Sequence, residues 1–402
     1  MVQTDYIHVP YGKAVYGEPE IEAVNKVLRS STQMGKHVRE MESRVAALYD
    51  KQYGIMVNSG SSALYLAAEL MNLPKGSEVI TPALTFSTTV APIVKKGWIP
   101  AFVDVEEGTY NVDASKVEAM IGLDTKAMII PNLMGNLPDW KILREIADKH
   151  QLFVLEDSAD TLGAEINGKS SGRFTDMSTT SFYGSHIINC AGNGGMLCVN
   201  GDAFYDRGRL LRSWGRSSSL FVESEAIENR FNVEVDGIPY DAKFVFEEPG
   251  FNIEPAELGA AFGCVQLDNL AWNIDSRTSN YHKMRTFFQQ WEDIFILPNQ
   301  LSDSRTGWLA FAVTIRESAP FIRRDLQIFL EKRNIQTRTV FTGNILRQPG
   351  FKNIAHKASP DGYPESDKVM RGGMLLACHH GLNEAQISHV MESVTLFMKQ
   401  YA

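Results

Sequence analysis

The chain has no apolar stretch close to the ~20 residues that a membrane-spanning helix needs, and its first residues, MVQTDYIHVPYGK, lack the apolar centre of a secretion signal. Its basic residues form no runs. With 39 lysines and arginines against 48 aspartates and glutamates, the formal charge is −9, so neither nucleic acid nor an anionic membrane is an expected partner. Four scattered cysteines without a CxxC pair predict no disulfide framework and no zinc site. We therefore expect a cytoplasmic protein with reduced thiols and no metal.

The sequence does contain the alternation typical of an α/β fold. From residue 54 to about 200, short apolar runs alternate with helical patterns. One predicted helix, DWKILREIADKH, places Trp140, Leu143, Ile146 and Ala147 on one face, which should pack against the sheet. We predict strands at YGIMVN, EVITP, IPAFVDV, KAMIIPN, LFVLED, TTSFYGS and GGMLCVN.

Two domains are predicted in these 402 residues. Residues 1–270 would form the larger one, with a polar, weakly periodic excursion at 217–248 that is long enough to reach a partner subunit. The alternation starts again in WLAFAVTI, FIRRDLQIFLEKR and IQTRTVF, and a final helix is expected from about 384 to 399. Residues 271–402 are therefore predicted to form a smaller C-terminal α/β domain.

A turn of small residues, Asn58 to Leu64, follows the first predicted strand and opens a helix. Backbone N–H groups at such a helix N-terminus bind phosphate. The same residues also fit an ordinary helix start with Ser61 or Ser62 as the cap. Both interpretations remain open when this motif is taken alone.

Two carboxylates, Glu156 and Asp157, end the apolar run LFVLED. In open α/β sheets, ligands bind at the carboxyl ends of the strands. An aspartate in this place can pair with a protonated ring nitrogen of a cofactor, which keeps the ring an electron sink. A capping or salt-bridged aspartate is the alternative.

The segment SFYGSH, residues 181–186, and the glycine-rich GNGGM follow. Together with MGKHVREME, NSGSSAL, NLMGN, EDSADTLGA, GFNIEPAELGAA, TGN and HHG, these motifs cover nearly the whole chain in order. The sequence resembles the sugar aminotransferase family of the fold-type-I pyridoxal-phosphate enzymes. The resemblance implies an aspartate-aminotransferase-like α/β fold with a large, mostly parallel sheet domain and a smaller C-terminal domain.

In that family the sixth residue of the SFxxxK motif is the lysine that binds the cofactor covalently, and here this residue is His186. A histidine ring has no primary amine and cannot form that bond, but it can act as an acid or base near neutral pH. A purely structural histidine in a relic fold, and an artificial lysine-to-histidine substitution that traps an aminotransferase, are the alternatives.

Within the family, the same exchange is typical of 3-dehydratases that act on nucleotide-linked 4-keto-6-deoxyhexoses. One kind, acting on CDP-4-keto-6-deoxyglucose, carries an iron–sulfur cluster held partly by cysteines after a WGR motif. Here Trp214-Gly215-Arg216 is followed by three serines, so no cluster and no reductase partner is expected. The chain looks more like the other kind, which acts on GDP-4-keto-6-deoxymannose and uses L-glutamate to convert pyridoxal phosphate into pyridoxamine phosphate.

The resemblance implies the following reaction. His186 moves the protons, the C3 hydroxyl leaves as water, and ammonia is released with a 4-keto-3,6-dideoxy sugar. Surface polysaccharide, such as lipopolysaccharide O-antigen, and secondary metabolites are equally suitable destinations.

For the cofactor phosphate, the resemblance implies contacts from Gly60 and Ser61, with Ser181 contributing and Asn252 reaching in from a second subunit. A homodimer with a shared active site is therefore expected.

For the rest of the site, the resemblance places Phe86 on the face of the cofactor ring and Asp157 on the ring nitrogen. Asp160 stands where lysine-bearing relatives carry glutamine or histidine, and an acidic residue there is typical of the dehydratases. Arg338 is a candidate for binding the glutamate carboxylate or the substrate diphosphate, because a guanidinium matches either.

Some residues depart from the dehydratase pattern. Ile187 follows His186 where a second histidine is usual, Asn193 replaces an acidic residue, and the loop is one residue longer, as in the aminotransferases. An ordinary sugar aminotransferase would need another lysine at the ring, and Lys169 on the turn NGKSSG is not expected to serve. A pyridoxal-phosphate-binding regulatory protein is a further alternative. His379 and His380 are interpreted as structural or substrate-side residues rather than metal ligands.

Overall fold

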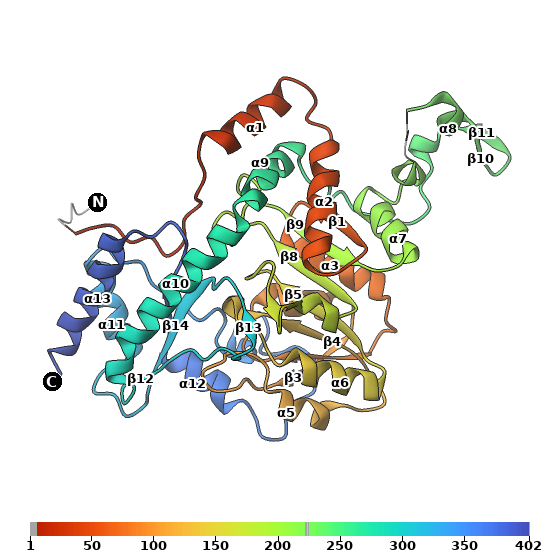
Figure 1. Cartoon of the computed structure of the whole chain (residues 1–402). Helices are drawn as coiled ribbons and strands as arrows, with labels where there is room; N and C mark the ends of the chain where they lie inside the picture. The colour runs from red at the N-terminus through yellow and green to blue at the C-terminus, as the bar shows by residue number, and fades with distance from the viewer. Residues whose placement is uncertain (1–5, 222, 224, 402) are drawn as a thin grey trace.

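The structure is a computed structural model that describes residues 6–221, 223 and 225–401. Its larger domain is built on a seven-stranded sheet with the order β1-β9-β8-β5-β4-β2-β3 (Figure 1). All strands are parallel except β9, which pairs antiparallel with both β1 and β8. The strands span Tyr53–Val57 (β1), Glu78–Pro82 (β2), Ile99–Val103 (β3), Thr125–Pro131 (β4), Phe153–Ser158 (β5), Met177–Ser181 (β8) and Gly195–Val199 (β9). The predicted large, mostly parallel sheet is confirmed.

Helices cover both faces of this sheet because its strands are apolar on both sides. Ile55 and Val57 of β1 join the core that also contains residues of α3, α4 and α7, whereas Met56 joins the core with α2 and α9. The helices of this domain are α1 (Glu18–Leu28), α2 (Lys36–Leu48), α3 (Gly60–Met71), α4 (Ser87–Lys95), α5 (Ala114–Val117), α6 (Trp140–His150), α7 (Asp202–Arg212) and α9 (Glu257–Asp268).

The amphipathic helix that the sequence predicts is α6. Trp140, Leu143 and Ala147 are buried, and Ile146 is half-buried against the same core. Asp139 begins the helix, since its side chain accepts the N–H groups of the first turn. Beside it lies a small sheet of β6 (Glu165–Ile166), β7 (Lys169–Ser170) and β13 (Ser304–Arg305).

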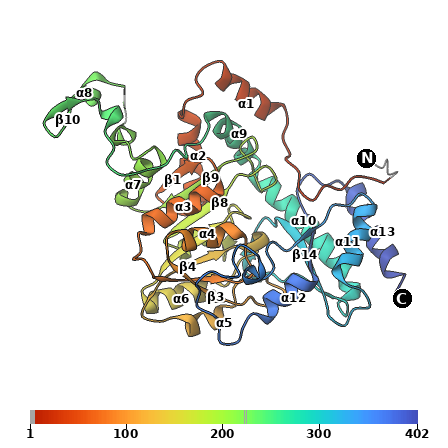
Figure 2. The same ribbon diagram turned by 180° about the vertical axis from the view of Figure 1, so that it is seen from behind.

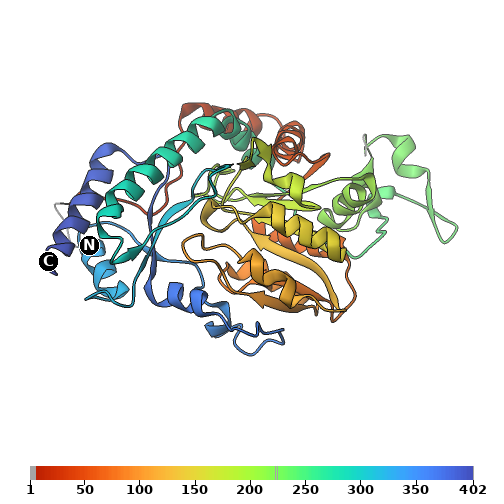
Figure 3. The same ribbon diagram turned by 60° about the horizontal axis from the view of Figure 1, so that its bottom comes forward.

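The smaller sheet is antiparallel, with the order β12-β14-β16-β15. Its strands are Phe295–Ile296 (β12), Ala310–Ile315 (β14), Arg338–Thr339 (β15) and Gly373–Ala377 (β16), and its helices are α10 (Leu270–Phe288), α11 (Arg323–Lys332), α12 (Pro364–Gly372) and α13 (Glu384–Met398). Figure 3 shows α10 running from the larger domain along the smaller one. The predicted strand IQTRTVF is only two residues long, because Phe341 adopts a left-handed conformation and ends the extended segment.

The predicted division after residue 270 coincides with the start of α10, and it remains a prediction. The N-terminal segment lies with the smaller domain, because Val9 pairs with Ile335 and is buried in the core of that domain.

The predicted excursion at 217–248 holds the short helix α8 (Ile227–Phe231) and the hairpin of β10 (Val233–Val235) and β11 (Ile238–Tyr240). It projects from the end of the molecule opposite the C-terminal domain (Figures 1 and 2). Several of its large apolar side chains are exposed, namely Ile227, Phe231, Val235, Ile238, Tyr240, Phe244 and Phe246. In the described part of the chain, no helix is both long and apolar enough to cross a lipid bilayer.

Candidate active site

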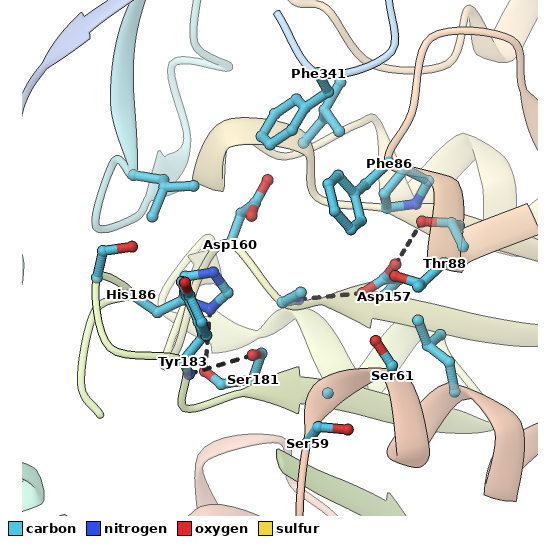
Figure 4. Close-up of a pocket in the computed structure, with 18 of the residues that line it drawn as sticks. Ser59, Ser61, Phe86, Thr88, Asp157, Asp160, Ser181, Tyr183, His186 and Phe341 are labelled. Atoms are coloured by element: carbon cyan, nitrogen blue, oxygen red, sulfur yellow. Dashed lines mark hydrogen bonds between the residues drawn. The ribbon is translucent and has the colours of Figure 1, made fainter. Parts of the chain in front are cut away.

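A cavity of about 380 Å³ lies where the carboxyl ends of the parallel strands meet. Its walls come from the segments after β1, β2, β4, β5 and β8, from the N-terminal segment and from the smaller domain. Among the residues predicted from the sequence, the structure brings together Gly60, Ser61, Phe86, Asp157, Asp160, Ser181 and His186 (Figure 4).

The N-terminus of α3 forms one end of this cavity. The side chain of Ser59 accepts the N–H of Ser62 at 3.1 Å, so Ser59 is the cap, and the alternative that placed the cap at Ser61 or Ser62 is wrong. Ser62 turns away to donate to Asn58 at 2.6 Å. Ser61 is therefore left to face the cavity, and within the described residues no hydrogen bond uses the backbone N–H groups of Gly60 and Ser61.

The backbone of this turn lies directly on the end of β8. A Cβ atom on Gly60 would lie 2.6 Å from the Cβ of Ser181, a distance that real side chains do not adopt. Glycine is therefore needed for the turn to stay close to the sheet. Two free N–H groups, a helix N-terminus and the Ser61 hydroxyl together make a site suited to a phosphate.

Asp157 lies at the end of β5 and is buried. Its Oδ2 accepts the Thr89 hydroxyl at 2.7 Å, and its Oδ1 accepts the backbone N–H of Ala159 at 3.2 Å. Burial raises the pKa of this carboxyl above its ordinary value, because no cation compensates for the lost water. A cationic group in the cavity would favour the carboxylate.

Asp160 follows one turn later and accepts the backbone N–H of Met134 at 2.8 Å. Met134 and Gly135 both have positive φ, and this turn of the NLMGN motif aims the N–H at the carboxylate. Burial, together with the nearby charge of Asp157, raises the pKa of Asp160 to about 7. Asp160 is therefore partly protonated at neutral pH.

His186 lies in the loop between β8 and β9. The predicted strand TTSFYGS ends at Ser181, because the chain turns there: the backbone N–H of His186 donates to the carbonyl of Tyr183 at 2.9 Å. The ring Nδ1 faces the carbonyl of Ser181 at 3.4 Å. A carbonyl only accepts, so Nδ1 carries the proton and Nε2 keeps a free lone pair.

A buried arginine on α10 supports this loop from behind. Arg277 donates to the backbone carbonyl of His186 at 3.0 Å and to that of Trp308 at 3.0 Å. Burial and the positive charge of Arg277 lower the pKa of His186 to about 4. His186 is thus neutral at physiological pH.

A sequence profile of the DegT/DnrJ/EryC1/StrS aminotransferase family matches residues 15–395. The chain belongs to this family. The dTDP-4-dehydro-2,6-dideoxy-D-glucose 3-dehydratase of Saccharopolyspora spinosa is 32% identical over 402 residues, which cover 97% of this chain and 86% of that protein.

Solved structures agree with this assignment. GDP-4-keto-6-deoxy-D-mannose-3-dehydratase of E. coli with bound hydrated pyridoxal phosphate superposes with a TM-score of 0.87 and 26% identity, covering 96% of this chain and 99% of that chain. A GDP-4-keto-6-deoxymannose-3-dehydratase with a trapped cofactor–glutamate geminal diamine gives a TM-score of 0.86 and 25% identity, over 96% and 100% of the two chains. The predicted fold class is confirmed, and the chain is a member of a pyridoxal-phosphate-dependent family that modifies nucleotide-linked sugars.

The lysine that the family uses for its covalent bond has no substitute in this cavity. In the described ranges, none of the residues that line the cavity is a lysine. Lys169 lies in β7, in a different surface pocket beside Arg173. A covalent cofactor bond through another lysine therefore has no support in this structure.

Two predicted residues lie outside the cavity of this chain. Asn252 is exposed and pairs with Ser213 beside the excursion. Arg338 is exposed and does not line the cavity, but its guanidinium lies 5.3 Å from the ring centroid of Tyr11, which does. Their assignments to cofactor phosphate and to a substrate anion remain predictions.

Several residues of the site were not found from the sequence. Phe341 meets Phe86 edge-on with 6.0 Å between ring centroids, and Tyr183 packs edge-on against His186. Thr89 lies in the TFSTT motif that identified Phe86, but the motif gave no sign that the Thr89 hydroxyl would bind Asp157. No local sequence signal marked Tyr11, because its place depends on contacts with the smaller domain.

The adjacent histidines His379 and His380 do not line the cavity. His379 Nε2 lies 3.0 Å from the Pro10 carbonyl, and His380 Nδ1 accepts from Arg277 at 3.2 Å. These contacts agree with the structural interpretation of both histidines.

Proposed function

We propose that this protein catalyses the C3-dehydration of a nucleotide-linked 4-keto-6-deoxyhexose with pyridoxal phosphate that L-glutamate has aminated. One observation carries the proposal: His186 occupies the position of the family's lysine, and within the described chain no lysine lines the cavity. Because the cofactor cannot be held by a covalent bond, non-covalent contacts must retain it. The relatives named for 3-dehydration favour this reaction over transamination.

The residues present fit pyridoxal phosphate. Gly60 and Ser61 offer unused N–H groups to a phosphate, and the tight approach of Gly60 to Ser181 shows why a larger residue would not serve. Asp157 is a buried carboxylate without a cation, which is the partner that a protonated pyridine nitrogen requires. The ring of Phe86 is 51% exposed at the cavity, where it can stack on a planar ligand.

When bound, the cofactor supplies an amino group for the sugar ketone and a ring that withdraws electrons. His186 provides the proton transfers: its neutral Nε2 accepts a proton on the cofactor side of the sugar, and the resulting imidazolium can return it to the departing C3 oxygen. Ser181 and Arg277 fix the tautomer and the position of the loop. The C3 hydroxyl leaves as water, and the net products are a 4-keto-3,6-dideoxy sugar, ammonia and 2-oxoglutarate, because glutamate supplies the two electrons that reduce C3.

An iron–sulfur cluster does not fit this chain. The residues after Trp214-Gly215-Arg216 are Ser217 to Ser219 in a short helical turn, which supplies no thiolates. Buried positions in the core hold all four cysteines, Cys190, Cys198, Cys264 and Cys378. L-Glutamate is therefore proposed as the source of the amino group, without a reductase.

We further propose that two copies of the chain share each active site. Asn252 is exposed in this chain, as expected for a residue that completes the partner's phosphate site. The excursion beside it carries exposed apolar side chains such as Phe231 and Ile238, which a second subunit would cover. The cytoplasm is the proposed location of this dimer, since nucleotide-linked sugars are the proposed substrates.

The test is an absorbance titration of the pyridoxal-phosphate-loaded protein with L-glutamate, followed by GDP-4-keto-6-deoxymannose and an assay for ammonia. We expect the aldehyde band to convert to the pyridoxamine band and ammonia to appear only when glutamate and sugar are both present. His186→Lys should abolish the dehydration, whereas the control His282→Lys, on the exposed face of α10, should not.

Other outcomes identify the alternatives. An aminated sugar without ammonia release would indicate an aminotransferase, for which the longer loop with Asn193 in the cavity is the supporting feature. Cofactor binding with no response to glutamate would indicate a binding protein or a trapped aminotransferase.

A further inference from the structure

We propose that Tyr11 is a substrate-binding residue whose hydroxyl donates a hydrogen bond to the hexose of the nucleotide sugar. This inference rests on the proposed function and adds to it a contact from the N-terminal segment. Tyr11 lines the same cavity as His186 and Asp160, although it lies 175 residues before His186 in the chain.

The N-terminal segment is fixed on the smaller domain. Val9 is buried and pairs with Ile335, and the Tyr11 backbone N–H donates to the side-chain carbonyl of Gln336 at 3.0 Å. The carbonyl of Pro10 lies 3.0 Å from His379 Nε2. The backbone from Val9 to Tyr11 is therefore fixed against the smaller domain, as is required of a residue that positions a ligand.

The next residue holds the segment against the catalytic loop. A Cβ atom on Gly12 would lie 2.7 Å from the Cβ of Ser185, the neighbour of His186. The backbone at Gly12 therefore touches the loop that carries the proposed base. The proposed cofactor contacts come from the larger domain, at the starts of α3 and α4 (Gly60 and Phe86) and the end of β5 (Asp157), which leaves the part of the cavity beside Tyr11 for the sugar.

The side chain of Tyr11 has a fixed ring and an available hydroxyl. The Arg338 guanidinium lies 5.3 Å from its ring centroid, a cation–π contact that holds the ring. Within residues 6–221, 223 and 225–401, no hydrogen bond involves the hydroxyl. Burial and the nearby Asp160 carboxylate raise the pKa of the phenol far above its ordinary range. The group thus remains a neutral donor, suited to a sugar hydroxyl or carbonyl oxygen.

The same contact gives Arg338 a second role. Its guanidinium packs on the ring of Tyr11 and orients the phenol, although Arg338 itself does not line the cavity. Its predicted contact with a substrate anion is compatible with this role, because Arg338 also borders a surface groove with Arg324 and Lys332.

The test compares Tyr11→Phe with the control Tyr16→Phe, which removes a phenol from the same segment outside the cavity. Binding is measured without turnover, on the pyridoxal-phosphate-loaded, glutamate-free enzyme. The probes are GDP alone, dTDP alone and the corresponding 4-keto-6-deoxyhexose conjugates. We expect Tyr11→Phe to weaken binding of the conjugate about five- to tenfold. The affinity for the nucleotide alone, and the glutamate-dependent formation of the pyridoxamine band, should each stay within about twofold of the wild type.

Each outcome decides the matter. Equal losses for nucleotide and conjugate, unchanged binding of the conjugate, or failure of the wild type to bind any conjugate would overturn the assignment of Tyr11. Failure of the proposed function has a different signature: the wild type binds the conjugate and Tyr11→Phe weakens that binding, but no glutamate-dependent ammonia is released.

Discussion

Replacing Asp160 by asparagine should stabilise the cofactor-free protein, and only above acidic pH. In the unfolded chain this carboxyl loses its proton near pH 3.8, whereas in the folded protein its pKa is about 7. Between these two pH values the carboxyl is protonated in the folded protein but ionised in the unfolded chain. Its unfavourable contribution to the free energy of folding therefore grows from pH 4 to pH 7 and is constant above pH 7. The difference corresponds to about 4 kcal/mol as an upper limit. Water at the half-buried side chain reduces the expected gain to about 1–3 kcal/mol.

The measurement is urea unfolding of wild type and Asp160→Asn at pH 4, 6 and 8.5. Asparagine keeps an oxygen for the Met134 N–H, so the hydrogen bond survives and the charge alone changes. The control Asp124→Asn alters an exposed carboxylate and should change stability by less than about 0.5 kcal/mol at every pH. The reasoning would be refuted if Asp160→Asn raised the free energy of unfolding equally at pH 4 and pH 8.5. A change in packing that does not depend on charge would then explain the gain.

Two further substitutions test the proposed cofactor site by titration with pyridoxal phosphate. Gly60→Ala should lower the affinity for pyridoxal phosphate at least about tenfold. The new Cβ would lie 2.6 Å from the Cβ of Ser181 and must push the turn away from the sheet. An unchanged affinity would show that the turn does not bind the phosphate. Thr89→Val removes the donor to Asp157 at nearly constant shape and should weaken binding about three- to tenfold. The control is Thr32→Val, at an exposed position outside the cavity, which should leave binding unchanged.

The parts of the fold that the sequence predicts are those with a short repeat. The strands β1 to β5 were found because each is an apolar run bounded by polar turns, and α6 because its buried residues recur at helical spacing. Asp157 could also be found from the sequence, because it ends an apolar run that forms a buried strand. In open α/β sheets, ligands bind at the carboxyl ends of such strands.

The rest of the site depends on contacts that no local pattern encodes. Tyr11 enters the cavity because residues 9 to 11 pair with residues 335 and 336, more than 300 positions away in the sequence. Arg277 reaches the His186 carbonyl from α10, a helix with no clear polar and apolar faces. The cap at Ser59 was missed because three serines, Ser59, Ser61 and Ser62, lie within four residues and have similar capping propensities. Only the geometry of the turn decides between them.

The replacement of a lysine by a histidine changes what the surrounding protein must provide. A lysine holds the cofactor and moves protons with one amine, whereas a histidine needs a defined tautomer and a defined charge state to act as a base. The Ser181 carbonyl sets the tautomer, and burial with the charge of Arg277 keeps the ring neutral. The same cavity raises the pKa of Asp160 to about 7. Environments that separate the pKa values of two titratable groups in this way support the proposal that His186 is the base, and they leave Asp160 as the group that titrates near neutral pH.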